Sequence, residues 1–341
     1  MSKLAPLIVL LLFPFQSYNQ ISVVQTDNRE KVLNLHLEHT YELDRGYYLS
    51  FLEFENGRLY GICPQLRRIY SLDIRQKRIK HFTFNKGKGP NEISRGPFGI
   101  SISEKNIVLN DTDTQRMVLF DYKGHPTQTV LYKQSEVSVG SIYNIRGENA
   151  FLNKVLNPLN GIRYSILDPA LGTTVSRYKI PPDLLKQLKK SRDIFRVSGY
   201  AAFSGDYLIH ANKYYGDLLM WDKKSGKFLK TVQVYDPGNP SNRKAQLGDM
   251  VGNIPPQNTK ATFLQLTDNP LLKERIFLLI NSKDGTFKNT TVYDYDLQKE
   301  EIVQQYKLPA PAKLIQSSNT HLFVYSEKQS EIYQYEIEKK N

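Results

Sequence analysis

The sequence predicts an all-β fold built from repeats, and three observations lead to this prediction. The first is composition: 22 Tyr and 16 Phe stand against 10 Ala, and aromatic residues suit a pleated surface, whereas Ala is the best helix former. The second is that 40% hydrophobic and 23% charged residues support a packed core and argue against disorder. The third is a short apolar strand that ends in an acidic residue and recurs along the chain.

The recurring strand defines a repeat of four strands. Before it lies a second apolar strand, after it come a tight turn and an outer strand, and an inner strand precedes each block. Spacings of 48, 47, 54, 74 and 40 residues separate the acids, and repeats of about 40–50 residues with four strands are typical of β-propeller blades. Insertions at 236–260 and around 281–290 explain the longer spacings. The six acids are Asp73, Asp121, Asp168, Asp222, Asp296 and Glu336.

The order of the repeats predicts a six-bladed β-propeller with four-stranded blades. The last repeat runs out of chain before its outer strand, while residues 32–43 alternate as a strand without a blade of their own. We therefore expect the N-terminal strand to pair into the last blade and close the ring, which removes exposed sheet edges. One helix is expected to start at Pro182. The blades are predicted at 47–84, 98–132, 141–180, 197–235, 261–308, and 313–341 plus 32–43, within a single domain of residues 20–341.

Residues 1–19 have the pattern of a signal peptide. Lys3 precedes a 12-residue apolar run at 4–15, which is shorter than the roughly 20 residues of a membrane-spanning helix. We expect a mature chain that starts near Gln20, with an uncleaved anchor as the alternative. The lone cysteine, Cys63, lies far from this segment and cannot form an internal disulfide, so we expect a buried thiol and a chain that is not lipidated. The predicted location is the periplasm or the cell exterior.

A glycine-proline segment follows the first repeat. Residues 86–93 read KGKGPNEI, and Gly87, Gly89, Pro90 and Glu92 match a G-x-G-P-G-E-F signature. The chain therefore resembles the six-bladed propeller proteins abundant in Bacteroidetes, which are related to TolB-like and NHL-like propellers. It departs from that signature at Asn91 and Ile93, and from the many lipoprotein members by lacking a lipid-bearing Cys. Because that family's function is largely undefined, the resemblance implies a fold rather than an activity.

The remaining motifs give little sign of catalysis. Each repeated acid begins a turn, where Asp accepts backbone hydrogen bonds. Asp111 and Asp113 have a D-x-D spacing but lack the glycine and distal Glu of a calcium loop. His36 and His39 lie three apart on a strand and should face opposite sides. No hydrolase, metalloprotease, phosphate-loop or paired-cysteine motif occurs, so catalytic residues stay unknown, and no metal or cofactor is expected.

Positive charge is the more informative feature. The formal charge is +12, or +11 without Lys3, and the long connections at 85–98, 181–196 and 236–260 together supply +6 of it. These connections emerge on one face of a propeller, where a positive field attracts anions, although long surface loops can also be charged only for solubility. Gly87, Gly89 and Pro90 are expected to fix the first connection. The candidate ligand-binding residues are Lys88, Asn91, Glu92, Arg95, Lys189, Lys190 and Arg192.

The sequence favours an exported, monomeric binding or scaffold module whose partner is a protein or an anionic glycan. The alternative is a metal-dependent lactonase- or lyase-like propeller enzyme, which would need ligands converging near the axis. The inner strands show no such set, so binding is favoured. The charge would also suit nucleic acid, but export argues against that partner. No transmembrane segment is expected after signal cleavage.

Overall fold

The computed structural model describes residues 32–94, 100–103, 105–111, 113–131, 142–144, 151–157, 161–168, 173–191, 194–240, 243–247 and 250–337. The predicted signal peptide and its cleavage near Gln20 lie outside the described residues. Within them, no helix has the length and apolar character needed to cross a membrane.

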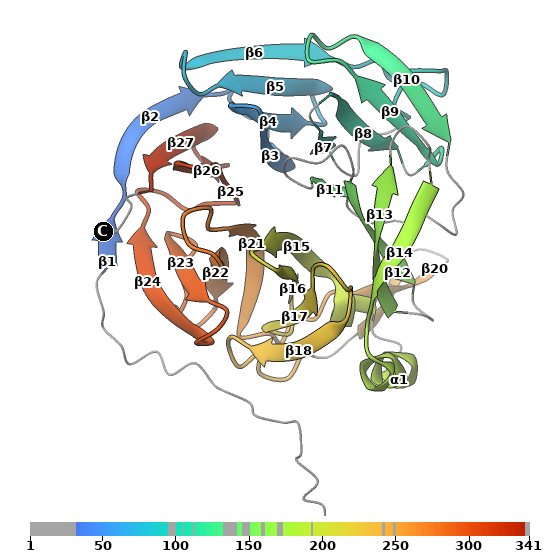
Figure 1. The fold of residues 1–341 in the computed structure, drawn as a ribbon, viewed down its shortest axis with the longest axis vertical. Coiled ribbons are helices and arrows are strands. Elements are labelled where there is room, and N and C mark those ends of the chain that lie inside the picture. The colour runs from blue at the N-terminus through green and yellow to red at the C-terminus, as the bar shows by residue number, and fades with distance from the viewer. Residues whose placement is uncertain are drawn as a thin grey trace, which may run out of the picture.

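The described chain is an all-β propeller, as the repeats predicted, with its sheets arranged around a central axis (Figure 1). The first sheet contains β3 (Phe51–Glu55), β4 (Arg58–Cys63), β5 (Arg68–Asp73) and β6 (Arg78–Thr83). The second contains β7 (Ile100–Ile102), β8 (Ile107–Asp111), β9 (Arg116–Phe120) and β10 (Pro126–Leu131). The third contains β11 (Ile142–Asn144), β12 (Phe151–Asn157), β13 (Gly161–Asp168) and β14 (Thr173–Lys179).

The second half of the chain continues the same pattern. The fourth sheet contains β15 (Gly199–Ser204), β16 (Tyr207–Asn212), β17 (Asp217–Asp222) and β18 (Phe228–Gln233). The next contains β21 (Ala261–Asp268), β22 (Arg275–Ser282), β23 (Thr291–Asp296) and β24 (Glu301–Lys307), and the last contains β25 (Leu314–Ser317), β26 (His321–Ser326) and β27 (Glu331–Glu336). Two insertions add α1 (Pro182–Ser191) with the 3-10 turn Ile194–Val197, and a hairpin of β19 (Arg243–Leu247) and β20 (Met250–Ile254).

The strand count corrects the expectation of six uniform four-stranded blades. Five sheets have four strands, whereas the β21–β24 sheet has five because β1 (Val32–Asn34) pairs parallel with β24. The expected single strand at 32–43 is therefore two strands on two sheets. The second, β2 (His36–Glu42), pairs antiparallel with β27. The buried Tyr41 anchors it, because its hydroxyl donates to Gln334 Oε1 at 2.7 Å.

The apolar pattern of the middle strands creates the cores between neighbouring sheets. All five residues of β8 and all five of β9 are buried, and one core joins the β15–β18 sheet to the β21–β24 sheet through side chains such as Met220 and Phe263. The outer strand β6 has no buried residue. The middle strands of these sheets are thus buried against neighbouring sheets, and β6 leaves the outer edge of the first sheet exposed.

The turns confirm the structural interpretation of several repeated acids. Asp73 Oδ1 accepts from Gln76 N–H at 2.9 Å, Asp121 Oδ1 from Lys123 N–H at 2.9 Å, and Asp222 Oδ1 from Ser225 N–H at 2.6 Å. Asp296 accepts in the same way from Gln298 N–H at 2.9 Å. Cys63 is a free, buried thiol, as expected.

Candidate functional site

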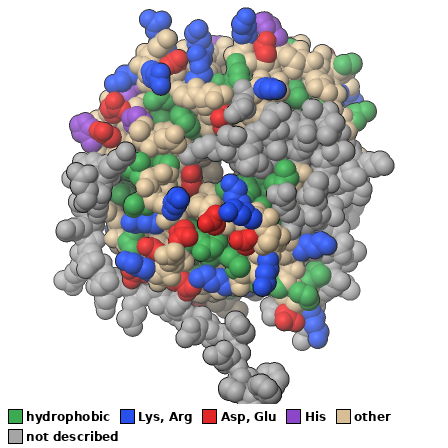
Figure 2. Space-filling model, viewed as in Figure 1, with side chains coloured by type: hydrophobic (Ala, Val, Ile, Leu, Met, Phe, Trp, Pro, Cys, Tyr) green, Lys and Arg blue, Asp and Glu red, His purple; other side chains and the backbone are tan. Residues whose placement is uncertain are grey.

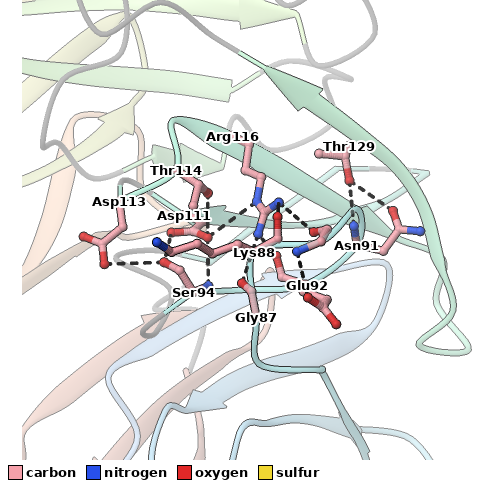
Figure 3. Close-up of polar contacts among 11 residues, drawn as sticks. Gly87, Lys88, Asn91, Glu92, Ser94, Asp111, Asp113, Thr114, Arg116 and Thr129 are labelled. Carbon is pink, nitrogen blue, oxygen red and sulfur yellow. Dashed lines mark hydrogen bonds and ion pairs between the residues drawn. The ribbon is translucent and has the colours of Figure 1, made fainter.

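The β6–β7 connection, which carries the glycine-proline motif, folds into a compact loop at residues 86–94 (Figure 3). Gly87 N–H donates to the Ile93 carbonyl at 3.0 Å, and Ile93 N–H donates to the Asn85 carbonyl at 2.9 Å. Asn91 has a φ of 65°, a conformation that Asn tolerates better than most residues. Asn91 can therefore adopt this turn without being replaced by Gly.

The two glycines make room for the carboxylate of Glu92. Gly89 N–H donates to Glu92 Oε2 at 2.7 Å. A Cβ on Gly87 would lie 2.0 Å from that oxygen, and one on Gly89 would lie 2.9 Å from it. The motif therefore encloses Glu92 within its own backbone, which is a structural role for this predicted ligand-binding residue.

The Arg116 guanidinium closes the loop from above, a contact the sequence did not predict. Its Nη1 donates to the carbonyls of Lys88 at 3.0 Å and Gly89 at 2.6 Å. Its Nη2 donates to the carbonyls of Gly87 at 3.2 Å and Glu92 at 2.5 Å. Arg116 is only 5% exposed. We call Arg116, the loop 86–94 and Asp111 the arginine clamp; Figure 3 shows the guanidinium pointing into the arc of the loop.

Asp111 balances the charge of Arg116 from the end of β8. Its Oδ2 lies 3.5 Å from Arg116 Nε. It also accepts from Ser94 N–H at 2.9 Å and Thr114 Oγ1 at 2.7 Å, while Oδ1 accepts from Ser94 Oγ at 2.8 Å. Burial acts to raise the pKa of Asp111, but these hydrogen bonds and the Arg116 charge outweigh it and lower the pKa below 3.8. Asp111 is thus an ionised member of the clamp.

The other predicted ligand-binding residues are only partly described. Asn91 N–H donates to Thr129 Oγ1 of β10 at 3.1 Å, and Lys88 is exposed. Lys189 and Lys190 lie on α1 with side chains outside the described part, and Arg95 and Arg192 are outside the described residues. α1 lies across the ring from β6 in Figure 1.

A second polar group lies where β16 turns into β17. Arg196 Nη2 is 3.1 Å from Asp217 Oδ2, and the Arg196 guanidinium lies 4.2 Å from the centre of the Tyr215 ring. Lys213 Nζ lies 5.4 Å from the centre of the Tyr214 ring. We call Arg196, Lys213, Tyr214, Tyr215 and Asp217 the β16–β17 cluster; cations over aromatic faces are held by the ring quadrupole.

A buried chain of hydrogen bonds fixes the acid of this cluster. Asn212 Nδ2 donates to Asp217 Oδ1 at 2.7 Å, His210 Nε2 lies 2.9 Å from Asn212 Oδ1, and Tyr164 Oη lies 2.6 Å from His210 Nδ1. All four side chains are buried. Burial raises the pKa of Asp217, and the Arg196 charge opposes that rise. Arg196 and Asp217 therefore neutralise each other as an ion pair within the fold.

Lys213 is the cation that this cluster does not neutralise. The backbone N–H of Lys213 donates to the Ser198 carbonyl at 2.7 Å, and its backbone carbonyl accepts from Phe263 N–H at 3.0 Å. Lys213 therefore lies between the chain entering β15 and the start of β21. It forms no ion pair with any described residue. Burial lowers its pKa below 10.5. A partly buried ammonium beside aromatic rings can bind an anion such as a carboxylate.

The described residues contain no cluster of three or more His, Cys, Asp or Glu side chains arranged to hold a metal ion. Both acids of the D-x-D pair face Ser94, whose Oγ lies 2.8 Å from Asp111 Oδ1 and 3.4 Å from Asp113 Oδ2. Arg196 belongs to the basic connection 181–196, so the sequence did indicate this part of the β16–β17 cluster. Lys213 and Arg116 were missed, although both stand beside the turn between the two middle strands, where a charged residue interrupts apolar sequence.

Comparisons with known proteins show the propeller fold. No protein-family model matches the chain, and no curated protein has a similar sequence. A solved structure of a DUF4221 family member from Bacteroides vulgatus matches with a TM-score of 0.57 and 14% identity, covering 90% of this chain and 98% of the other. The WD40 repeats of RRP9 match with a TM-score of 0.56 and 6% identity, covering 90% and 100%. The Cps50 (Swd1) propeller domain of Myceliophteria thermophila matches at 0.50 and 11%, covering 89% and 100%. At these identities the likeness concerns the fold alone.

Proposed function

We propose that the protein is an exported, non-catalytic binding module that captures a carboxylate-bearing partner, a protein or an anionic glycan, on its loop face. The observation that carries the proposal is Lys213, a partly buried cation without an ion-pair partner among the described residues. A buried charge costs stability unless it is paired. A ligand carboxylate would supply the missing pair.

The surroundings of Lys213 suit binding better than chemistry. Tyr and Arg are the side chains that most often dominate binding energy at protein interfaces, and the cluster supplies Tyr214, Tyr215 and Arg196. The buried chain from Asp217 to Tyr164 holds Arg196 in place, which limits the entropy lost on binding. The clamp, by contrast, uses its charges internally.

The proposal includes six blades and a ring closed by β2. Its support is that β2 pairs with β27, and that Leu43 N–H donates to the Ser330 carbonyl at 2.9 Å as the chain leaves for β3. A chain beginning at Arg45 would leave the β27 edge unpaired and remove the buried Tyr41. We expect it to aggregate or to melt well below the chain that starts near Gln20; equal stability would mean that the ring closes otherwise.

Binding is tested with two immobilised carboxylate polymers, poly-L-glutamate and polygalacturonate. The variant Lys213→Met keeps the length of the side chain and removes its charge. The matched control is Lys223→Met, because Lys223 Nζ also lies over a ring, 5.0 Å from the centre of Phe203. We expect Lys213→Met to weaken binding at least fivefold and the control to leave it unchanged.

The preference between the polymers assigns the partner class, and equal binding by wild type and Lys213→Met contradicts the proposal. The enzyme alternative, a metal-dependent lactonase or lyase, has a separate test: elemental analysis of the purified protein. One tightly held divalent ion per chain would favour that alternative over a binding module. Mass spectrometry of the exported protein tests the signal peptide.

A further inference from the structure

The turn before the outer strand of the first blade and the strand β6 itself carry a row of cations. Four exposed basic residues lie within six positions, and no acidic residue occurs between 74 and 82. Figure 2 shows Lys and Arg side chains spaced along the upper rim of the molecule, where β6 lies. We define the β6 rim as Arg75, Lys77, Arg78 and Lys80.

The cations of the β6 rim have few acidic neighbours among the described residues. None of the four forms an ion pair with a described residue. Lys77 is within Coulombic range of Glu38 on β2, but Glu38 is itself paired with His321 at 2.7 Å. The nearest acid along the chain, Asp73, is held by Arg58 at 3.2 Å and by Gln76 N–H. On the adjacent blade, Asp121 lies 3.1 Å from His125. The rim therefore presents net positive charge to an incoming ligand.

β6 also offers backbone groups. It is last in the strand order β3-β4-β5-β6, and within the described part of the chain it pairs only with β5. One other outer strand is covered, because β1 lies on β24 as a fifth strand, while β2 completes the blade of β27 as its fourth strand. An uncovered edge strand is a template for an added strand.

Charge on an edge strand can serve only to prevent aggregation, but this explanation does not account for the whole rim. The outer strand β18 has Lys230 paired with Glu300 at 2.5 Å, and β10 starts with Pro126 and contains no charged residue. On the strands themselves, β6 carries two cations without an ion pair to any described residue, Arg78 and Lys80, whereas β10 has none and the one cation of β18 is paired. The turns before β6 and β18 both add basic residues, so the difference between these edges lies in the strand β6 itself.

We propose that the β6 rim binds an acidic segment of a partner protein, which adds to β6 as a fifth strand. Alternate residues of a strand share a face, so Arg78 and Lys80 lie about 6.7 Å apart on one face. Acidic residues at positions i and i+2 of an added strand match this spacing. β1 on β24 shows that a blade of this chain accepts a fifth strand. This site is separate from the Lys213 site on the loop face.

The test uses a synthetic peptide of alternating Glu and Thr. The variant Arg78→Gln with Lys80→Gln is compared with Lys224→Gln and Lys227→Gln, which remove the same charge from the turn before β18. We expect the β6 variant to weaken peptide binding at least tenfold and the control variant less than twofold. Equal loss in both variants would show a general charge effect and would overturn the proposal.

Peptide chemistry separates strand addition from simple charge attraction. Two peptides are N-methylated at alternate residues, one in each phase, which blocks the hydrogen bonds of one edge at a time. We expect one phase to lose binding and the other to keep it, while a peptide with the same residues in Glu and Thr blocks binds at least fivefold more weakly. Equal binding of the two N-methylated peptides and the block peptide would overturn the proposal. So would binding of heparin as tight as that of the alternating peptide. Lys213→Met should leave the alternating peptide's affinity unchanged, so failure of one site is distinguishable from failure of the other.

Discussion

The arginine clamp and the β16–β17 cluster occupy the same place in two different blades. In each, a turn joins the two middle strands: Asp111 and Arg116 flank one turn, and Asn212 and Asp217 flank the other. The turns share one backbone feature: the residue just before the second strand has a positive φ, 53° at Gln115 and 69° at Gly216. The repeat therefore supplies one framework, and the side chains differ on it.

The polarity of the contact is reversed between the two blades. In the clamp, the strand supplies the cation Arg116, and the preceding connection supplies four carbonyls. In the cluster, the strand supplies the anion Asp217 and the preceding connection supplies the cation Arg196. Both contacts tie a connection to its blade, but only the cluster leaves over a cation, Lys213, at its turn.

This difference teaches that basic residues in the connections are not equivalent. A cation that is paired with a carboxylate and hydrogen-bonded inside the fold contributes stability, whereas one without an ion-pair partner reduces stability and can pair with a ligand. Removing the cation should therefore have opposite consequences in the two regions.

Replacing Arg116 with Met should destabilise the protein by about 3–5 kcal/mol, because Asp111 then remains buried without its partner. Four backbone carbonyls also lose their donors. Urea unfolding measures the loss, and the exposed Arg78→Met serves as the matched control, expected to change the free energy by less than about 0.5 kcal/mol. A tolerated Arg116→Met would mean that the clamp is not structural.

Replacing Asp111 with Asn should cost about 1–3 kcal/mol at neutral pH, since buried donors lose an ionised acceptor. The pKa of Asp111 is lowered in the folded state from 3.8. Its stabilising contribution is therefore complete above that value and disappears as the pH falls through the lowered pKa. Urea unfolding from pH 7 to pH 3 should show the difference between wild type and Asp111→Asn shrinking below about pH 4; a constant difference would argue against an ionised Asp111.

Replacing Gly87 with Ala should cost about 1–2 kcal/mol through overpacking against Glu92. The displaced carboxylate would lose its bond from Gly89 N–H. In a double-mutant cycle with Glu92→Ala, the Gly87→Ala cost should largely vanish, because the clash partner is gone. Additive costs would show that the two residues act independently.

The propeller could be predicted from the sequence because the strand repeats are local. The contacts of the candidate sites could not, because they join distant positions. Arg116 donates to carbonyls that lie 24 to 29 residues earlier in the chain, with β7 and β8 between them in the sequence. Nothing in the local sequence fixes the direction of the Arg116 side chain. The N-terminal segment was likewise predicted as one strand, because alternation gives no sign that Leu35 interrupts it and that β1 and β2 join different sheets.

Replacing Lys213 with Met should change stability least, by less than about 0.5 kcal/mol or towards greater stability at neutral pH. Burial lowers the pKa of Lys213 below 10.5. Wild type should therefore gain stability relative to Lys213→Met as the pH rises through that lowered pKa, since the unfolded chain then binds more protons. Thermal unfolding between pH 7 and pH 10 measures the trend. A loss of stability of more than about 1.5 kcal/mol in Lys213→Met would lie outside the roughly ±0.5 kcal/mol typical of surface substitutions. It would show that Lys213, like Arg116, has a structural role.

The most direct test is the rise in melting temperature caused by whichever carboxylate polymer binds more tightly. Wild type and Lys213→Met are compared in a chain that also carries Arg78→Gln and Lys80→Gln, so that the β6 rim does not contribute. A ligand at about 100 times its dissociation constant adds about 2.7 kcal/mol to stability. We predict a clear rise with Lys213 present and little or none with Met, from starting temperatures that are equal or higher for the Met variant. An equal rise in both chains would contradict the assignment of Lys213 as the binding cation.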